Sequence, residues 1–424
     1  MNTAQPRSGR GGICVKTSFV VGLTRPFEAG KDDRHGDSVE FASWRHRGGV
    51  CSDWTPGLSG VCRSPWEAVS LTAKVSAAVC WTVVRFVRRG FHPEFPKWTL
   101  QFELLRAVIR TINDLYGDRM VKDVRHARVI RTQSEAVGTL LGWFYCQWYG
   151  RRMETVEFNG LEHLWILPKD SYKNDTKRLV VMYVHGGAFS LLSPRFYSFF
   201  GISLGAAMER EFAVRNKDAR VDIFLATYHK TPEVCFPTQP KEIVAMYEYL
   251  LDHEGLSSDQ VILAGDSAGG GLVMSALLRL RDVHKPNRLP LAGIVSSPFV
   301  DMSESIDPAS AHNCILTRSI AKAVRVVYHP TCSDRATWAD ASAVHCDLRG
   351  LPPVFIQAAT LDYLYQDSVR LAEKAKADGV EGWEMDVNEG VSHVFSLFPS
   401  WILPYSNVGV QKMAEFAVRK FLKE

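Results

Sequence analysis

Short apolar runs alternate with amphipathic stretches along the chain from about residue 160 to its end. The apolar runs include VVMYV, VDIFLA, VILAG, AGIVSS and VFIQAA, and each consists mostly of apolar residues without a regular alternation with polar ones. The stretches between them carry apolar residues three or four positions apart, which is the period of a helix that packs on one face. Continuous strands separated by helices are typical of a mostly parallel sheet covered on both sides. The pattern therefore predicts an α/β fold with a central, mostly parallel sheet flanked by helices.

Two regions depart from this alternation. Residues 97–158 have a helical pattern, and we expect them to form a helical cap segment; residues 301–345 are rich in His, Asn, Asp and Pro, with no clear strand. The second region is predicted to be a cap insertion above the sheet, within a main domain that spans residues 159–424. The aromatic stretch GWFYCQWYG, 142–150, either lines an apolar pocket or packs in a core or domain contact.

The amino-terminal part has a different composition. Residues 1–65 are rich in Gly, Arg, Ser and Asp without any period, which predicts a disordered extension. Residues 66–96 include an apolar stretch, 68–90, in which Lys74 and Arg85 leave only ten uncharged residues between them. A membrane-spanning helix needs about 20 predominantly apolar residues, so this segment predicts an amphipathic helix. Such a helix either lies on a membrane surface or docks on the domain. The predicted localisation is therefore cytoplasmic or associated with the endoplasmic-reticulum membrane.

Composition excludes some classes of function. The chain has 424 residues, of which 46% are hydrophobic and 23% charged, the balance of a globular protein with a sizeable core. The net charge of +4 is small and no nucleic-acid-binding motif is present, so nucleic acid is not an expected partner. The nine cysteines include no CxxC pair, which argues against a disulfide framework and against a zinc site. Nothing in the sequence predicts an oligomeric state.

The stretch VILAGDSAGGGLVMSA, 261–276, joins an apolar run to a helical run through a serine. Gly265 and Gly269 lie two positions before and after Ser267. A turn from strand to helix at one residue strains its backbone, projects its side chain outward and leaves no room for a Cβ atom at the flanking positions. The helix dipole there favours a developing negative charge. The sequence, with Asp266 completing the motif, predicts a nucleophile elbow in which Ser267 is the nucleophile; an idle serine in a glycine-rich turn is the alternative.

A serine nucleophile needs a base and an acid, which follow it along the chain in this kind of fold. Asp362 comes directly after the apolar run PPVFIQAAT, and His393 lies in the loop that follows WEMDVNE. We therefore expect Asp362 as the acid and His393 as the base. Asp367 is an alternative acid, although an acidic residue in a first helical turn usually serves the helix dipole. Three other histidines do not follow a late strand: His229, His329 and His345.

Donors for an oxyanion are predicted in the loop that follows VVMYV. His185, Gly186, Gly187 and Ala188 come directly after this apolar run, and small residues let backbone N–H groups point into a cavity. The predicted oxyanion hole comprises this Gly-Gly-Ala loop, with Gly187 and Ala188 as its main pair of donors, and the N–H of Ala268 beside the nucleophile. We expect His185 to support the loop by hydrogen bonding.

Together HGGAF, GDSAG, Asp362 and His393 resemble the hormone-sensitive-lipase-like branch of the α/β-hydrolases, from about residue 160 to the end. The stretches YHKTPEVCFPTQP, SSPFVD and GLPPVFIQAATLDYLYQD are similar to further segments of that branch. Residues 97–150 are similar to the cap region of members held at membranes, such as arylacetamide deacetylase and fungal steryl acetyl hydrolases. Two positions depart from the family pattern. Ala188 replaces a third glycine, which leaves the donor intact if its φ is negative, and Val394 replaces a glycine after the histidine, where a β-branched residue can shift the loop.

The resemblance implies an α/β-hydrolase fold with a helical cap and a serine carboxylic-ester hydrolase activity. The substrate would be a small hydrophobic ester, such as an acetyl, lipid or steryl ester, cleaved through an acyl-enzyme without a metal or an organic cofactor. One alternative is an amide deacetylase that uses the same chemistry. Another is a catalytically silent receptor for a small ligand, as in the plant gibberellin receptors, which resemble this family but lack the working histidine.

Overall fold

The computed structural model describes residues 61–424 except 170–175, 284–287 and 304–310. The chain divides into two units, residues 1–54 and 55–424, and everything described here belongs to the second. The extension predicted for residues 1–65 therefore lies, up to residue 60, outside the described residues.

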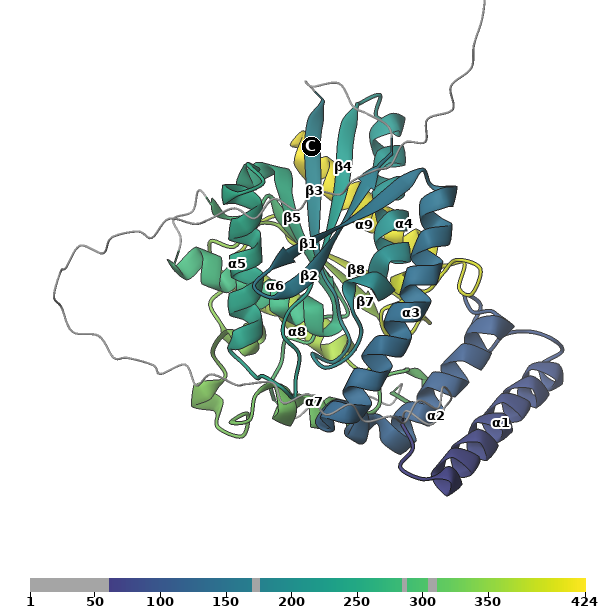
Figure 1. Ribbon diagram of the computed structural model, residues 1–424. Coiled ribbons are helices and arrows are strands. Elements are labelled where there is room, and N and C mark those ends of the chain that lie inside the picture. The colour runs from purple at the N-terminus through teal and green to yellow at the C-terminus, as the bar shows by residue number, and fades with distance from the viewer. Residues whose placement is uncertain (1–60, 170–175, 284–287, 304–310) are drawn as a thin grey trace, which may run out of the picture. The chain divides into compact units, whose positions relative to one another are not determined.

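A sheet of eight strands forms the centre of the second unit, in the order β1-β2-β4-β3-β5-β6-β7-β8 (Figure 1). From β4 to β8 all neighbouring strands pair in parallel, whereas β2 is antiparallel to both β1 and β4. The mostly parallel sheet expected from the sequence is thus confirmed. The strands are Arg151–Phe158 (β1), Leu161–Pro168 (β2), Lys177–Val184 (β3), Ala219–Ala226 (β4), Val261–Asp266 (β5), Ala292–Ser296 (β6), Val354–Ala359 (β7) and Glu384–Asn388 (β8).

The first strand corrects the sequence interpretation of residues 151–158, which were expected to belong to the helical cap segment. These eight residues form β1 and pair with β2 in a hairpin. The reason is the turn between the strands, where Asn159 and Gly160 both have positive φ values of 53° and 71°. Asn-Gly is the pair that a two-residue hairpin turn prefers, because both residues tolerate this conformation.

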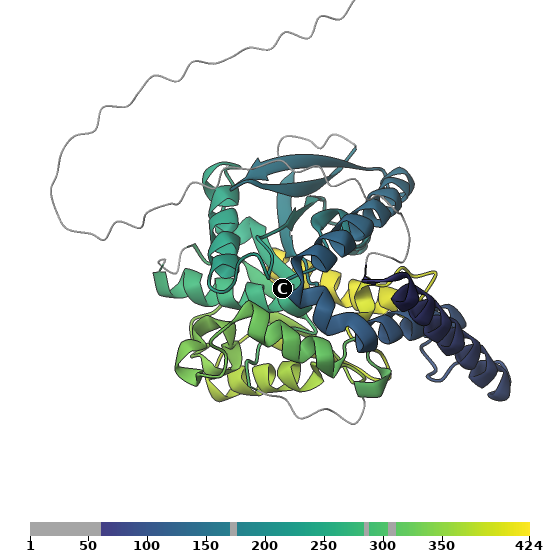
Figure 2. The same ribbon diagram turned by 60° about the horizontal axis from the view of Figure 1, so that its bottom comes forward.

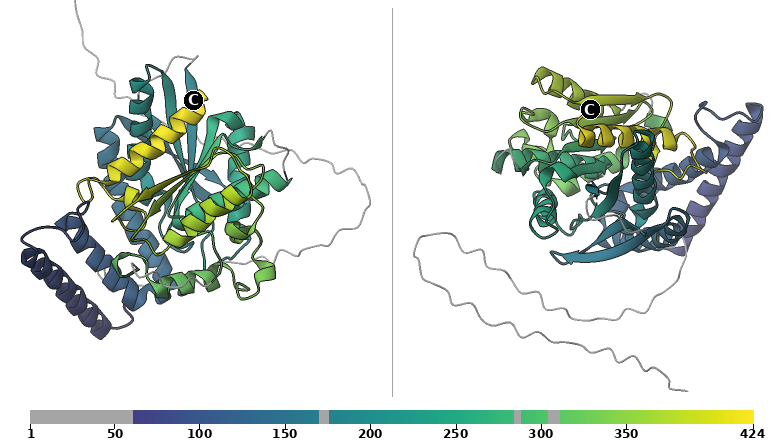
Figure 3. Two further views of the ribbon diagram at one scale, coloured as in Figure 1. Left: turned by 180° about the vertical axis from the view of Figure 1, so that it is seen from behind. Right: turned by 90° about the horizontal axis from the view of Figure 1, so that it is seen from above.

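Helices cover both faces of the sheet (Figures 1 and 3). One apolar core lies between the sheet and α4 and α9, and a second core, on the other face, includes α5, α6 and α8. Alternate residues of β3 enter the two cores, as the side-chain period of a strand requires. The helices are Pro65–Arg88 (α1), Leu100–Lys122 (α2), Val124–Trp148 (α3), Pro194–Val214 (α4), Thr238–Asp252 (α5), Ser267–Val283 (α6), Arg318–Tyr328 (α7), Tyr365–Ala377 (α8) and Ser406–Leu422 (α9).

A cap that includes α2 and α7 lies next to the helix-covered sheet (Figure 2). In the insertion after β6, the described residues form α7 and short 3₁₀ turns. α7 packs on α2 at close range, since a Cβ atom on Gly117 of α2 would lie 2.3 Å from a side-chain carbon of Ile320. Two segments far apart in the sequence therefore build the cap together.

The helix α1 packs on α2 through one face only. Its Leu71 is buried and its Glu67 pairs with Arg119 of α2, at 2.8 Å. Among the described residues it is the one helix long and apolar enough to cross a membrane, with a mean hydropathy of 1.3 over its most apolar 18-residue window. The placement of this helix on a membrane surface stays a prediction.

Candidate active site

The turn between β5 and α6 carries Ser267. Its φ is +51°, the left-handed conformation in which a short strand-to-helix turn places one residue. A Cβ atom on Gly269 would lie 2.1 Å from the carbonyl oxygen of Val184, and one on Gly265 would lie 2.7 Å from the Gly269 backbone. The steric expectation for these two glycines is therefore confirmed, because any side chain would force the strand and the helix apart.

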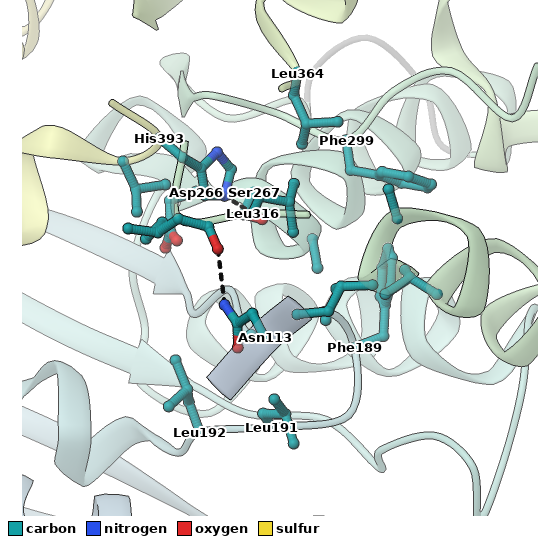
Figure 4. Close-up of a pocket in the computed structure, with 18 of the residues that line it drawn as sticks. Asn113, Phe189, Leu191, Leu192, Asp266, Ser267, Phe299, Leu316, Leu364 and His393 are labelled. Atoms are coloured by element: carbon teal, nitrogen blue, oxygen red, sulfur yellow. Dashed lines mark hydrogen bonds between the residues drawn. The ribbon is translucent and has the colours of Figure 1, made fainter. Parts of the chain in front are cut away.

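Three side chains from different strand ends meet at this turn. The Nε2 atom of His393 lies 3.0 Å from Oγ of Ser267, and its Nδ1 atom lies 2.9 Å from each carboxylate oxygen of Asp362 (Figure 4 draws Ser267 and His393). Asp362 follows β7 and His393 follows β8, and both are buried. Parallel strands end at the same edge of a sheet, which is why residues so distant in the sequence come together.

The alternative acid and bases have other partners. Asp367 lies in the first turn of α8 and pairs with Arg370 at 3.0 Å. The other three histidines contact groups other than Ser267. His229 lies 2.5 Å from a carboxylate oxygen of Glu242, and His329 lies 2.8 Å from the carbonyl oxygen of Thr337. His345 lies 3.5 Å from a carboxylate oxygen of Asp301.

Two carboxylates act on the imidazole of His393. Burial by itself lowers the pKa of this histidine, but the charge of Asp362, its hydrogen bond and the charge of Asp266 outweigh burial and raise the pKa above 6.5. An imidazole with a raised pKa holds a proton more firmly, which is what a base that receives a hydroxyl proton requires.

A cysteine of the cap insertion touches the same carboxylate. The Sγ atom of Cys314 is 3.7 Å from Oδ1 of Asp362, and it accepts hydrogen bonds from the backbone N–H groups of Leu316 and Tyr363, both at 3.3 Å. Burial, followed by the charge of Asp362, raises the pKa of this thiol to about 12. The thiol therefore stays protonated and donates to Asp362, which also accepts from the N–H of Leu364 at 2.9 Å.

The His-Gly-Gly-Ala loop differs from the prediction at two residues. The N–H of Gly186 donates to Asp266 and to the hydroxyl of Tyr197, both at 3.1 Å, so it is not available to an oxyanion. Gly187, Ala188 and Ala268 line the cavity beside Ser267. The φ of Ala188 is +57° rather than negative, so alanine occupies a conformation that normally selects glycine.

Buried polar groups hold this loop in place. His185 has Nε2 3.1 Å from Oγ1 of Thr227, and its ring stacks on Tyr228 with the centroids 4.9 Å apart. Burial, together with nearby Lys230, lowers the pKa of His185 well below 6.5, so the ring is neutral and supports the loop as expected. 

Asp266 connects the loop to the nucleophile turn. It accepts hydrogen bonds from the hydroxyls of Tyr183 and Tyr197, at 3.0 and 2.9 Å, in addition to the N–H of Gly186. Burial raises the pKa of Asp266 to about 6, against the opposing effect of the tyrosine hydrogen bonds. The residue before Ser267 is therefore part of the support for the oxyanion loop.

Val394 also adopts a left-handed conformation, with φ +47° and ψ +40°. This conformation is rare for a β-branched residue. Its N–H donates to the hydroxyl of Ser297 at 3.2 Å, which helps to hold the loop. The substitution of the usual glycine does not move the imidazole of His393 out of reach of Ser267.

An apolar cavity of about 190 Å³ opens beside Ser267 (Figure 4). A polar side chain, that of Asn113 from α2, lines it and donates to the Ile315 carbonyl at 2.8 Å. The aromatic stretch 142–150 does not line this cavity; its Tyr145 and Tyr149 line a separate cavity of about 30 Å³ with Phe199 and Phe200. Most of the lining is apolar: Phe189, Leu191, Leu192, Phe299, Ile315, Leu316, Ile320, Val324, Leu364 and Val394.

Comparison with known proteins decides the family. A family profile described as alpha/beta hydrolase fold matches residues 181–397, about half of the chain. The chain belongs to the α/β-hydrolase family. Its relatives place it in the hormone-sensitive-lipase-like branch of that family.

Two relatives of this α/β-hydrolase show the extent of the similarity. It is 32% identical to an acetyl-hydrolase of Streptomyces hygroscopicus over 51% of this chain and 66% of that protein, just under two thirds of the relative's length. It is 27% identical to an esterase of Acinetobacter venetianus over 56% of this chain and 74% of that protein.

Two solved structures are similar to this α/β-hydrolase. The esterase EstE5, soaked with p-nitrophenyl butyrate, has a TM-score of 0.59 and 26% identity, over 70% of this chain and 92% of that one. An esterase of the bacterial hormone-sensitive lipase family has a TM-score of 0.54 and 26% identity, over 68% of this chain and 98% of that one.

Three residues at the site of this α/β-hydrolase were not predicted from the sequence, although Ser297 lies in the family-like stretch SSPFVD. Asn113 lies in α2, before the matched residues 181–397 begin. Cys314 lies in the cap insertion, and Ser297 is an ordinary serine of SSPFVD. Only the fold brings these side chains to the cavity, to Asp362 and to Val394.

Proposed function

We propose that this hydrolase is a serine carboxylesterase that cleaves an ester with a short apolar acyl group through an acyl-enzyme. In this proposal Ser267 is the nucleophile, His393 the general base and acid, and Asp362 the group that orients the imidazole. The observation that carries it is the chain of contacts from Oγ of Ser267 through His393 to Asp362, at 3.0 and 2.9 Å.

The first half-reaction acylates the serine. Oγ of Ser267 attacks the ester carbonyl carbon while its proton passes to Nε2 of His393. Asp362 accepts the hydrogen bond from Nδ1–H, which keeps Nε2 as the proton acceptor and stabilises the imidazolium that forms. The C–O bond to the alcohol then breaks, and the alkoxide leaves with the proton from Nε2.

The second half-reaction releases the acid. His393 takes a proton from a water molecule, whose oxygen attacks the acyl carbon, and the proton then returns to Oγ of Ser267 as the ester bond breaks. Both steps pass through an oxyanion, which the N–H groups of Gly187, Ala188 and Ala268 would bind. One such donor contributes about 3 kcal/mol to the transition state in comparable sites.

The size of the cavity supports a short acyl group. Its volume of about 190 Å³ is below the range of about 300–1,000 Å³ that is typical of sites for drug-sized ligands. An acetyl or butyryl group would lie against Phe189, Phe299 and Leu316, whereas a long acyl chain would not fit. A bulky alcohol group would have to remain outside the cavity.

Covalent labelling and a series of substrates test the proposal. A fluorophosphonate should label the intact protein, and Ser267→Ala should abolish both the labelling and the hydrolysis of p-nitrophenyl acetate with little change in thermal unfolding. Among p-nitrophenyl esters, kcat/KM should be highest for acetate and butyrate. An intact protein that resists labelling, or a Ser267→Ala variant that keeps its rate, would contradict the serine mechanism. A kcat/KM that rises steadily with chain length would contradict the short acyl group.

A further inference from the structure

The carboxyl-terminal half of α3 exposes a continuous apolar surface. We call it the α3 aromatic face, and its members are more than half exposed: Val137 (51%), Leu140 (59%), Trp143 (54%), Phe144 (55%) and Trp148 (85%). A soluble protein exposes single apolar residues as a matter of course, but a contiguous group of this kind marks a contact surface.

The opposite side of α3 is fixed against α4. A Cβ atom on Gly138 would lie 2.3 Å from the Arg195 carbonyl oxygen, and one on Gly142 would lie 2.1 Å from Oγ of Ser198. Leu140 and Phe144 each follow one of these glycines by two positions, which is about 200° around a helix axis. The close packing of the glycine side therefore keeps the α3 aromatic face turned outward, and α3 cannot bury it by rotating.

The surface of α3 also lacks charge where the aromatic residues lie. Between Glu135 and Arg151 the sequence has no Asp, Glu, Lys or Arg. Trp401, 62% exposed, lies near Tyr145 in this part of α3. Trp401 follows the His393 loop along the chain, so the exposed indole is connected to the segment that carries the proposed base.

We propose that the α3 aromatic face, with Trp401, docks on the surface of a lipid bilayer. Trp and Phe beside uncharged polar residues form the composition of the membrane interface, where an indole places its ring among acyl chains and its N–H among headgroups. The exposed arginines of these helices are paired, Arg128 (67% exposed) with Glu233 at 3.1 Å and Arg85 of α1 (44% exposed) with Glu94 at 2.9 Å, so aromatic composition rather than charge is what favours the bilayer.

A separate group of exposed indoles lies on α1, which packs on α2. In Figure 1, α2 lies between α1 and α3. α1 exposes Trp66 (82%) and Trp81 (55%), and the guanidinium of Arg88 lies 5.6 Å from the ring centroid of Trp81. These indoles lie outside the α3 aromatic face and therefore serve as a comparison for it. The benefit of docking rests on the proposed function, because an apolar ester concentrates in a bilayer.

Binding to vesicles tests this inference on the full chain. The probes are phosphatidylcholine vesicles with and without about one fifth phosphatidylserine. Leu140→Gln, Trp143→Gln and Trp148→Gln are combined in one variant, since glutamine is a good helix former and these side chains point outward. The matched control carries Trp66→Gln and Trp81→Gln in α1. The affinity of the α3 variant for vesicles should fall by about tenfold or more, while its rate of p-nitrophenyl acetate hydrolysis stays unchanged.

Three results would overturn the inference. In the first, the unsubstituted protein binds neither kind of vesicle. In the second, the α3 variant binds vesicles as well as the unsubstituted protein does, and only the α1 variant loses binding. In the third, the unsubstituted protein does not bind vesicles and is a dimer that the α3 substitutions dissociate. Sedimentation velocity separates the last case. Hydrolysis of the soluble ester is measured independently. A protein that hydrolyses this ester but does not bind vesicles would therefore contradict the proposed docking and leave the proposed function intact.

Discussion

The thiol of Cys314 lies 3.7 Å from the carboxylate of Asp362, so a residue of the cap insertion contacts the residue that orients His393. A hydrogen bond to a carboxylate draws negative charge away from its other partner. We therefore treat Cys314 as a positioning residue that tempers the attraction between Asp362 and the imidazole.

Replacing this thiol should shift the pH dependence of the reaction. In Cys314→Ala, Asp362 loses a donor, attracts the imidazolium more strongly and raises the pKa of His393. The acid limb of kcat/KM should move to higher pH, whereas Cys314→Ser, which keeps a donor, should move it little or in the opposite direction. Rates on p-nitrophenyl acetate between pH 5 and 9 measure this. If the acid limb of kcat/KM has the same midpoint in both variants and in the unsubstituted protein, Cys314 is not a positioning residue. Loss of packing alone would lower the rate without moving this midpoint.

The unsubstituted protein should lose activity on acidification with a midpoint above pH 6.5. The base must be neutral to accept the serine proton, and the carboxylates beside His393 raise its pKa above that value despite burial. The active fraction therefore falls as the pH drops through the raised pKa. A pH profile of kcat/KM with an acid midpoint well below 6.5 would mean that the carboxylates do not dominate.

The two acidic residues of the loop and helix after β7 should differ sharply in their effect on catalysis. Asp362→Asn removes the acceptor for Nδ1–H of His393, and we expect kcat to fall by about 10⁴-fold. Asp367→Asn should change kcat only a few-fold, because Asp367 pairs with Arg370 and not with His393. Steady-state kinetics of the two variants decide the assignment, and a large loss in Asp367→Asn alone would reverse it.

Asp367 should instead reveal itself in stability. Burial, followed by the charge of Asp301, raises the pKa of Asp367 to about 7 from an ordinary value near 4. The folded protein therefore binds a proton here that the unfolded chain has already lost, and this carboxyl costs stability as the pH rises from about 4 to 7. Relative to the unsubstituted protein, Asp367→Asn should gain up to about 1.4 kcal/mol per pH unit in that interval. Denaturant unfolding at pH 5 and 7 gives the comparison, and a pH-independent difference would show that Asp367 is charged throughout.

The unusual backbone of the oxyanion loop predicts opposite effects at adjacent residues. Ala188→Gly places glycine at φ +57° and should stabilise the fold by about 1 kcal/mol or less, with kcat unchanged because the N–H remains. Gly187→Ala would bring a Cβ atom 2.5 Å from the Leu191 carbonyl oxygen at φ +106°, and should lower both stability and kcat. Thermal unfolding and kinetics measure the pair. Destabilisation by Ala188→Gly would contradict the strain.

The sequence predicted the parts of the fold that depend on local pattern. Continuous apolar runs predicted the parallel strands, and the glycines around Ser267 predicted a turn without room for a Cβ atom. The hairpin of β1 was missed although Asn159–Gly160 signals it, because the helical period before it extends so close to the strand.

Features that depend on tertiary packing were beyond the sequence. The N–H of Gly186 is occupied by Asp266 and Tyr197, which no local pattern indicates. The aromatic residues around Trp143 looked like core or pocket lining, because apolar character alone does not say which side of a helix meets the domain. The side of α3 that packs on the domain is set by Gly138 and Gly142, which allow α4 to approach.

The cavity combines parts of different origin along the chain. Ser267, Asp362 and His393 stand at the ends of strands, whereas Asn113 reaches the same space from α2, ahead of the residues that match the family. In the proposed mechanism, the reacting side chains and the Asn113 side chain therefore come from separate parts of the chain. Substitutions in α2 would therefore change substrate selectivity without replacing Ser267, Asp362 or His393.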